Sequence, residues 1–307
     1  MNKRNLTIIL LSIVSVGIIF FIIGDLWISA TRIKNHPSIK KDFKKINVAT
    51  SFYPVYFFTQ QIAGNKAEVF NITPEKSNPQ SYKLTAQNIK TLKESDLVIL
   101  NGLDFELWTN DAIEINKSIC LASSNLSENQ VIEITETKMN PYIWISPVLA
   151  KQMTDKILEG FLEKDVKNKN YYQANTEKLK TELDNLDREY KNELANCYNK
   201  KFVVLDFSFS YLAKQYNLNQ ILLSGLSINE NPAEQQIKNI KDFIKEQNIK
   251  YIFAENSLNF QWQKNIEEKL EIKIILLDVI NKDLLRENYF SRMRNNLKNI
   301  KRGLECE

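Results

Sequence analysis

The chain has 307 residues, of which 43% are hydrophobic, so it can bury the core of one large domain or two smaller ones. Its 41 Lys and Arg against 37 Asp and Glu give a net charge of +4, spread along the sequence, which argues against nucleic acid as a partner. Only 7 glycines occur, and neither GxGxxG nor GxxxxGK[ST] is present, so the common nucleotide-binding loops are excluded.

The N-terminus has the pattern of an export signal. Lys3 and Arg4 precede an uncharged apolar run of about 19 residues, 6–24, which is long enough to cross a ~30 Å hydrocarbon layer as a helix. The basic residues favour an N-terminus in the cytoplasm and a chain on the extracytoplasmic face. Because residues 27–30 (WISA) make a poor cleavage site, we expect residues 1–30 to be an uncleaved anchor. A cleaved signal, giving a secreted or periplasmic protein, is the alternative.

A first α/β pattern follows a polar linker over residues 31–45. Short strands rich in β-branched residues alternate with amphipathic helices, which is typical of a parallel sheet. The predicted strands cover residues 46–51, 67–72 and 96–100, and the predicted helices cover residues 55–63, 85–93 and 148–162. We expect residues 46–165 to form an N-terminal α/β lobe.

A long charged segment, residues 171–195, contains no Gly or Pro and places Leu and Tyr at spacings of three and four. It predicts an amphipathic helix of roughly 37 Å. A coiled coil is one interpretation. We prefer a rigid strut within a connecting region, residues 166–199, because another α/β pattern begins directly after it.

That second pattern predicts a C-terminal α/β lobe over residues 200–307. Its strands are expected at residues 202–206, 220–223, 251–255 and 274–278, with helices at residues 211–216, 232–247 and 289–304. The predicted fold class is therefore α/β, with two Rossmann-like lobes of parallel sheet joined by one long rigid helix. Ligands bind at the carboxyl ends of such strands, so we expect a ligand crevice between the lobes.

The three cysteines, Cys120, Cys197 and Cys306, have no C-x-x-C spacing, which argues against a cysteine zinc site. A Cys120–Cys197 disulfide would be compatible with an extracytoplasmic location. We expect three unpaired thiols instead. With no histidine base in the folded region and no nucleophile elbow, we expect no catalytic site and no enzyme.

Several short motifs occur in an order that carries a family resemblance. They are SFYPV at residues 51–55, NGLDFELW at 101–108, IWISP at 143–147, YLA at 211–213 and the final helix from Met293. Over about residues 46–306 the chain resembles the metal-specific substrate-binding proteins of bacterial zinc- and manganese-type ABC importers. The resemblance implies a solute-binding protein that captures a divalent metal ion between two lobes and presents it to a membrane permease. We expect it to act as a monomer.

The resemblance also implies four ligand positions, which in relatives hold three histidines and one carboxylate. Here they are Gln80, Tyr142, Asp206 and Asp278. All three histidines are replaced, and Asp278 keeps the carboxylate. The single histidine of the chain, His36, lies in the linker and is expected to be a surface residue.

These four side chains offer an amide, a phenol and two carboxylates. Zn²⁺ prefers nitrogen and sulfur donors, so an oxygen set favours Mn²⁺ over Zn²⁺ and also suits Mg²⁺, Ca²⁺ or ferric iron. Asp206 and Asp278 should repel each other unless a cation, a shared proton or a lysine neutralises them. Glu255 also ends a strand, and we expect it to be a solvated carboxylate.

The alternative is a decayed metal site. Tyr142 would then be an aromatic wall for an organic ligand, and the chain would be a degenerate family member acting as a non-metal binding or adhesion module. The three lost histidines motivate this alternative. Trp108 and Trp144 are expected to be packing residues.

Overall fold

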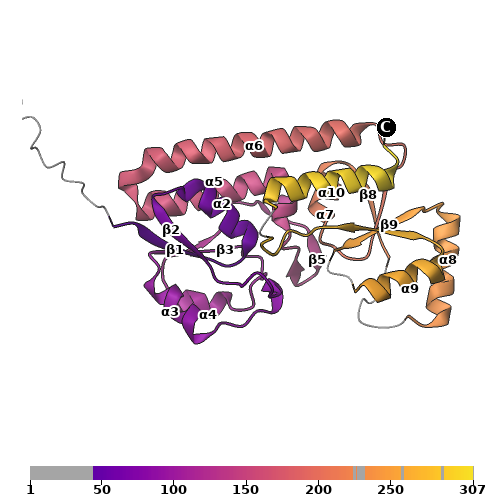
Figure 1. Cartoon of the computed structure of the whole chain (residues 1–307), viewed down its shortest axis with the longest axis horizontal. Coiled ribbons are helices and arrows are strands. Elements are labelled where there is room, and N and C mark those ends of the chain that lie inside the picture. Colours follow the sequence, from indigo (N-terminus) through magenta and orange to yellow (C-terminus); the bar gives the residue numbers. More distant parts are fainter. Residues whose placement is uncertain (1–43, 224–225, 227–231, 257–258, 285–286, 307) are drawn as a thin grey trace, which may run out of the picture. The chain divides into compact units, whose positions relative to one another are not determined.

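The computed structural model describes residues 44–223, 226, 232–256, 259–284 and 287–306. Residues Lys45–Glu307 form one compact unit that contains two parallel sheets and a long helix (Figure 1). This is the predicted α/β class. The predicted N-terminal anchor and most of the linker, residues 1–43, lie outside the described residues. Among the helices that are described, none is long and apolar enough to span a membrane.

The first sheet has four parallel strands in the order β2-β1-β3-β4. The strands are β1 (Ile46–Thr50), β2 (Ala67–Asn71), β3 (Leu97–Leu100) and β4 (Ile119–Leu121). Successive side chains point to opposite faces of the sheet. Val48 and Ile99 therefore join one hydrophobic cluster, whereas Ala49 and Val98 join another. Burial on both faces explains why β3 reads as a continuous apolar run.

Helices cover both faces of this sheet (Figure 1). The elements are α2 (Tyr53–Ala63), η1 (Pro79–Ser81), α3 (Ala86–Glu94), α4 (Thr109–Ile115), η2 (Glu128–Gln130), η3 (Ile143–Ile145) and α5 (Pro147–Lys164), with a small antiparallel pair, β5 (Glu133–Thr135) and β6 (Lys138–Met139). Phe58 of α2 and Met153 of α5 belong to the cluster of Val48, and Leu92 of α3 and Ala112 of α4 to that of Ala49. The short elements α4, β4, β5 and β6 were not predicted, because each is too short to show a period.

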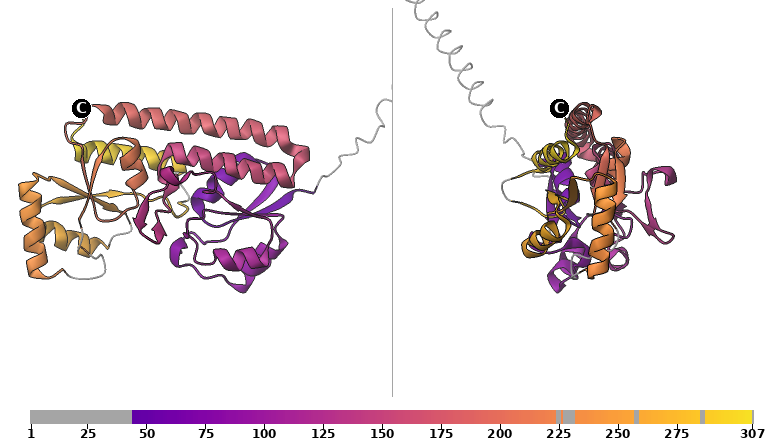
Figure 2. Two further views of the ribbon diagram at one scale, coloured as in Figure 1. Left: turned by 180° about the vertical axis from the view of Figure 1, so that it is seen from behind. Right: turned by 90° about the vertical axis from the view of Figure 1, so that its right-hand side faces the viewer.

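The second sheet is also parallel, in the order β10-β9-β7-β8. Its strands are β7 (Lys201–Val204), β8 (Asn219–Leu222), β9 (Tyr251–Glu255) and β10 (Lys273–Leu277), and its helices are α7 (Ser210–Gln215), α8 (Glu234–Glu246), α9 (Phe260–Leu270) and α10 (Tyr289–Leu304). Helix α10 packs on one face, whereas α8 and α9 lie on the other (Figure 2). A Cβ on Gly303 of α10 would overlap the ring of Phe253, so this glycine allows α10 to approach β9 closely.

Helix α6 (Lys169–Ala195) follows a short turn, η4 (Val166–Asn168), and has 27 residues, about 40 Å at 1.5 Å per residue. Its buried face includes Tyr172, Leu179, Leu183 and Tyr190, at the spacings expected for an amphipathic helix. It packs on α2 and α5 of the first lobe and on α10 of the second (Figures 1 and 2). One continuous helix therefore supports both lobes.

Cys197 and Cys306 form a disulfide across 109 residues of sequence. The expectation of three unpaired thiols is therefore wrong, and so is the Cys120–Cys197 alternative. Cys197 follows α6 and Cys306 follows α10, and the packing of these two helices brings their ends together. Cys120 is the free thiol, and it is buried.

Candidate metal-binding site

Gln80 and Tyr142 lie in two loops of the first lobe, and the same kind of side-chain to backbone hydrogen bond fixes each loop. The Asn78 side chain accepts a hydrogen bond from the backbone N–H of Gln80 at 3.1 Å, and Asn140 does the same for Tyr142 at 3.0 Å. Asn favours this bond to the backbone two residues on, which fixes a tight turn. In the first turn, Pro79 starts the 3-10 helix η1. The N-P-Q and N-P-Y sequences therefore set the conformation of both predicted positions.

The same kind of hydrogen bond occurs in the second lobe, where the predicted carboxylates Asp206 and Asp278 are themselves the acceptors. Asp206 Oδ1 accepts from the backbone N–H of Ser208 at 2.7 Å, and Asp278 Oδ1 accepts from that of Ile280 at 2.8 Å. Both aspartates lie just beyond the ends of parallel strands, β7 and β10. One oxygen of each is thus occupied by its own loop.

Loops of the two lobes meet directly. The Asn140 amide donates to the Phe207 carbonyl at 2.7 Å, and the Tyr211 hydroxyl donates to the Asn140 carbonyl at the same distance. The Trp144 indole donates to the Val279 carbonyl at 2.8 Å. Buried amides and indoles need such partners. These bonds hold the loop of Tyr142 beside the loops that follow β7 and β10.

Tyr142 lies in a group of polar side chains drawn from both lobes. The pKa of its phenol is raised to about 12, chiefly by burial and also by the negative charges of Glu255 and Asp206, while hydrogen bonds with Ser208 and Gln80 act in the opposite direction. Ser208 and Gln80 therefore lie within hydrogen-bonding reach of the phenol, and the charges of Glu255 and Asp206 lie near enough to act on it. Three of the four predicted positions, Gln80, Tyr142 and Asp206, therefore lie together.

Ser208 and Glu255 are functional candidates that sequence reasoning missed or misjudged. The Ser208 hydroxyl donates a hydrogen bond to Glu255 Oε1, and Ser208 is buried. Glu255 is half-buried and bonded to Ser208, so it is only partly the solvated strand-end carboxylate that was expected. The position of Glu255 at the end of β9, next to β7 and β10 in the sheet, was the available signal.

Asp278, the fourth predicted position, is engaged by Arg292 of α10. Arg292 Nε lies 2.7 Å from Asp278 Oδ2, and Nη2 lies 2.8 Å from Oδ1, which is a bidentate pair. Asn296 adds hydrogen bonds of 2.7 Å to the backbone N–H and carbonyl of Asp278. Arg292 and Asn296 follow Tyr289 at helical spacing, on the buried face of α10. This spacing was a sequence signal from which their burial could have been predicted.

The donor set of this group is dominated by oxygen. Among the described residues, no group of three or more His, Cys, Asp and Glu side chains could hold a metal ion. A site here would depend on the carboxylates of Asp206 and Glu255 together with the Tyr142 phenol, the Ser208 hydroxyl and the Gln80 amide. Such hard oxygen donors suit Mn²⁺, Mg²⁺ or Ca²⁺ better than Zn²⁺.

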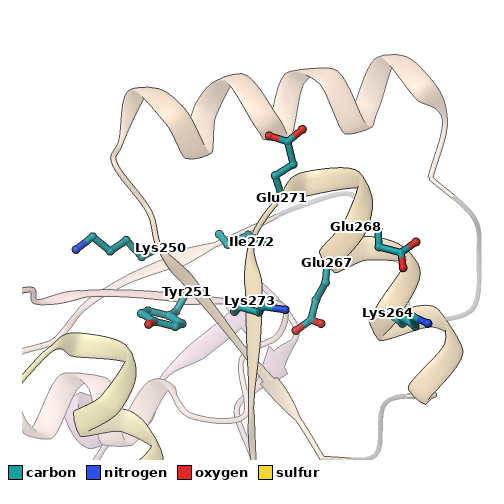
Figure 3. A pocket seen from close by; sticks show the side chains of 8 residues that line it. All are labelled: Lys250, Tyr251, Lys264, Glu267, Glu268, Glu271, Ile272 and Lys273. Atoms are coloured by element: carbon teal, nitrogen blue, oxygen red, sulfur yellow. The ribbon is translucent and has the colours of Figure 1, made fainter.

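A separate surface hollow of about 540 Å³ lies at the amino ends of β9 and β10, the edge of the sheet opposite to Asp278 and Glu255. Lys264, Glu267 and Glu268 of α9 are among the residues that line it (Figure 3). Glu271 pairs with Lys241, and Glu267 accepts the backbone N–H of Ile274. Parallel α/β sheets bind ligands at the carboxyl ends of their strands, and this hollow lies at the opposite ends, so we do not consider it the ligand site.

Comparison with known proteins agrees with this architecture. The chain matches the family model "Zinc-uptake complex component A periplasmic" over residues 48–303. It is 28% identical to the high-affinity zinc uptake system protein ZnuA of Bacillus subtilis, over 85% of this chain and 88% of that protein. It is 24% identical to the zinc-binding lipoprotein AdcA of Streptococcus pneumoniae, of which it spans only 56%.

Solved structures give the same result. The metal-dependent lipoprotein YcdH of Bacillus subtilis superposes with a TM-score of 0.77 at 28% identity, covering 84% of this chain and 99% of that one. The Zn(II)-bound ZnuA-like domain of AdcA from Streptococcus pneumoniae gives 0.76 at 25% identity, covering 85% and 100%.

The fold is thus that of a two-lobed extracytoplasmic solute-binding protein. The chain belongs to the family of the periplasmic component A of zinc-uptake complexes. The family supports the ABC-importer hypothesis made from the sequence and not the adhesion alternative.

Proposed function

We propose that this chain captures a divalent metal ion outside the cytoplasm and delivers it to the permease of an ABC importer. The observation that supports the proposal is that Gln80, Asp206 and Glu255, from two lobes, all lie near enough to the Tyr142 phenol to act on it, with Ser208 bonded to both carboxylates. Two half-buried carboxylates beside a phenol favour a bound cation, because they would otherwise repel each other. Residues 1–30 would hold the chain at the membrane surface as an anchor, or be removed as a signal, and the chain would act as a monomer.

Of the four predicted positions, Gln80, Tyr142 and Asp206 are proposed to surround the bound ion, whereas Asp278 is already paired with Arg292. We propose Mn²⁺ rather than Zn²⁺ as the preferred metal, since the side chains supply oxygen and no imidazole or thiolate. The named relatives are zinc proteins, so zinc is the necessary comparison. Because α6 packs on helices of both lobes, we propose that release to the permease requires only a small reorientation of the lobes.

The test is titration of the purified, chelator-treated chain with Mn²⁺, Zn²⁺, Ca²⁺ and Fe³⁺, followed by calorimetry and by thermal unfolding. We expect Mn²⁺ to bind at micromolar concentration or tighter and to raise Tm. A ligand at 100 times its Kd should stabilise the fold by about 2.7 kcal/mol. The variant Glu268→Gln, on the exposed part of α9, is the control and should bind as the parent does. If none of the four ions binds at micromolar concentration, the proposed function is wrong.

A further inference from the structure

The carboxylate of Asp278 is already paired with a cation of the chain itself, the guanidinium of Arg292. Arg292 contacts both oxygens of Asp278 and also donates from Nη1 to the Lys282 carbonyl at 2.6 Å. Its side chain is only 2% exposed, and its guanidinium lies 5.3 Å from the centre of the Tyr53 ring. The guanidinium is therefore fixed by several contacts at once.

An incoming metal ion could reach Asp278 only by displacing this guanidinium. Arginine does not lose its proton in proteins, so the displaced group would remain charged in a buried place. Separating one partner of a buried ion pair from the other is strongly unfavourable. The second Asp278 contact, from the Ile280 N–H to Oδ1, would compete as well. Asp278 is consequently a poor ligand in this chain.

Glu255 lies in a position to replace Asp278 as a carboxylate ligand of the metal ion. Strand β9 lies between β10 and β7, and in the parallel register Glu255 is opposite Leu277, one residue before Asp278. The Ser208 hydroxyl bonds to Glu255, while the Ser208 backbone N–H bonds to Asp206. One serine thus connects the two carboxylates that border Tyr142.

We infer that Glu255, together with Asp206 and Tyr142, binds the metal ion, and that Asp278 is not a ligand because Arg292 is its permanent counterion. This inference rests on the proposed function and refines it. Two carboxylates, a phenol and a neighbouring hydroxyl define a site for a hard divalent cation such as Mn²⁺. The Asp278–Arg292 pair forms a neutral wall of that site.

The experiment compares Mn²⁺ binding by the parent chain with binding by two variants, using calorimetry. We expect Glu255→Gln to weaken Mn²⁺ binding at least tenfold. We expect the double variant Asp278→Leu/Arg292→Met, which removes both charges of the pair together, to bind Mn²⁺ within about threefold of the parent. Replacing both partners of a buried pair by apolar groups is often tolerated, so this variant should fold. Circular dichroism and Tm without metal verify the fold of each variant.

The outcomes separate the two proposals. If the parent binds Mn²⁺ but Glu255→Gln binds it equally well, Glu255 is not a ligand and the inference is wrong, while the proposed function stands. A folded double variant that loses Mn²⁺ binding would show that Asp278 is a ligand and would also overturn the inference. A parent chain that binds none of the four ions overturns both proposals.

Discussion

The indole of Trp144 donates a hydrogen bond to the carbonyl of Val279 at 2.8 Å, across 135 residues of sequence. Trp144 belongs to η3 of the first lobe, and Val279 follows β10 of the second. A second bond runs in the opposite direction, from the Tyr289 hydroxyl to the Trp144 carbonyl at 2.6 Å. Trp144 is fully buried, so these bonds are shielded from water. They join the lobes next to the candidate site.

Replacing Trp144 with Phe should lower the free energy of unfolding by about 1–3 kcal/mol, because the buried Val279 carbonyl loses this donor. Urea denaturation gives the value. Trp108→Phe is a matched control, since Trp108 is also buried but its Nε1 has no hydrogen-bond partner among the described residues. We expect a smaller loss for the control. Equal losses in the two variants would show that ring size, and not the hydrogen bond, matters at Trp144.

Thiol counting tests the Cys197–Cys306 disulfide. The denatured chain should expose one reactive thiol without reductant and three with it. In the native chain Cys120 should react slowly, since burial raises the pKa of its thiol to about 12 and little thiolate forms near neutral pH. Three reactive thiols in the unreduced, denatured chain would disprove the pairing.

The same disulfide should contribute to stability. Cys306→Ser opens a loop that spans 109 residues, and a chain-entropy argument predicts a loss of about 2–5 kcal/mol. Under reducing conditions the parent should lose a similar amount, whereas Cys306→Ser should not change further. Comparison of urea midpoints with and without reductant provides the measurement.

Glu106 predicts a pH dependence of stability. Its carboxylate accepts backbone N–H bonds from Asn101 at 2.7 Å and Gly102 at 3.3 Å, but burial still raises its pKa above the ordinary value of 4.5. The folded chain therefore binds this proton more tightly than the unfolded chain does. The contribution of Glu106 is greatest below pH 4.5 and is lost as the pH rises through the folded-state pKa.

The comparison is with Glu106→Gln, which removes the titrating group. As the pH rises from 4 to 8, the free energy of unfolding of the parent should fall relative to that of Glu106→Gln. Urea denaturation at each pH measures this difference, with the exposed Glu68→Gln as a control. A difference that stays constant or grows in favour of the parent would contradict the prediction.

The predicted ligand positions can be tested by introducing the histidines that the resemblance implies. The triple variant Gln80→His/Tyr142→His/Asp206→His would place three imidazoles where the family resemblance implies histidines, and imidazole nitrogen suits Zn²⁺ at neutral pH. We expect it to bind Zn²⁺ at least tenfold more tightly than the parent chain, by calorimetry. Equal zinc affinity would mean that these three positions do not surround one ion.

Much of the fold follows from the sequence. Residues 251–255 and 289–304 form the predicted strand and helix with the same bounds, and the predicted helix at residues 171–195 begins only two residues earlier. These elements have an apolar period repeated over enough residues to identify them, and period is a local property. Helix α9 was missed because its apolar residues Phe260, Trp262, Ile266 and Leu270 are few among polar neighbours.

The site divides in the same way. The resemblance implied that Gln80, Tyr142, Asp206 and Asp278 form one group, and the motifs that carry it, such as the N-P-Q and N-P-Y turns, are local. The partners of Asp278, Glu255 and Cys197 are not local. Arg292, Ser208 and Cys306 reach them only because α10 packs on the sheet and on α6, and because β9 lies between β7 and β10. Hydrophobic pattern determines which face of an element is buried, whereas the tertiary packing alone decides which polar groups on different elements meet.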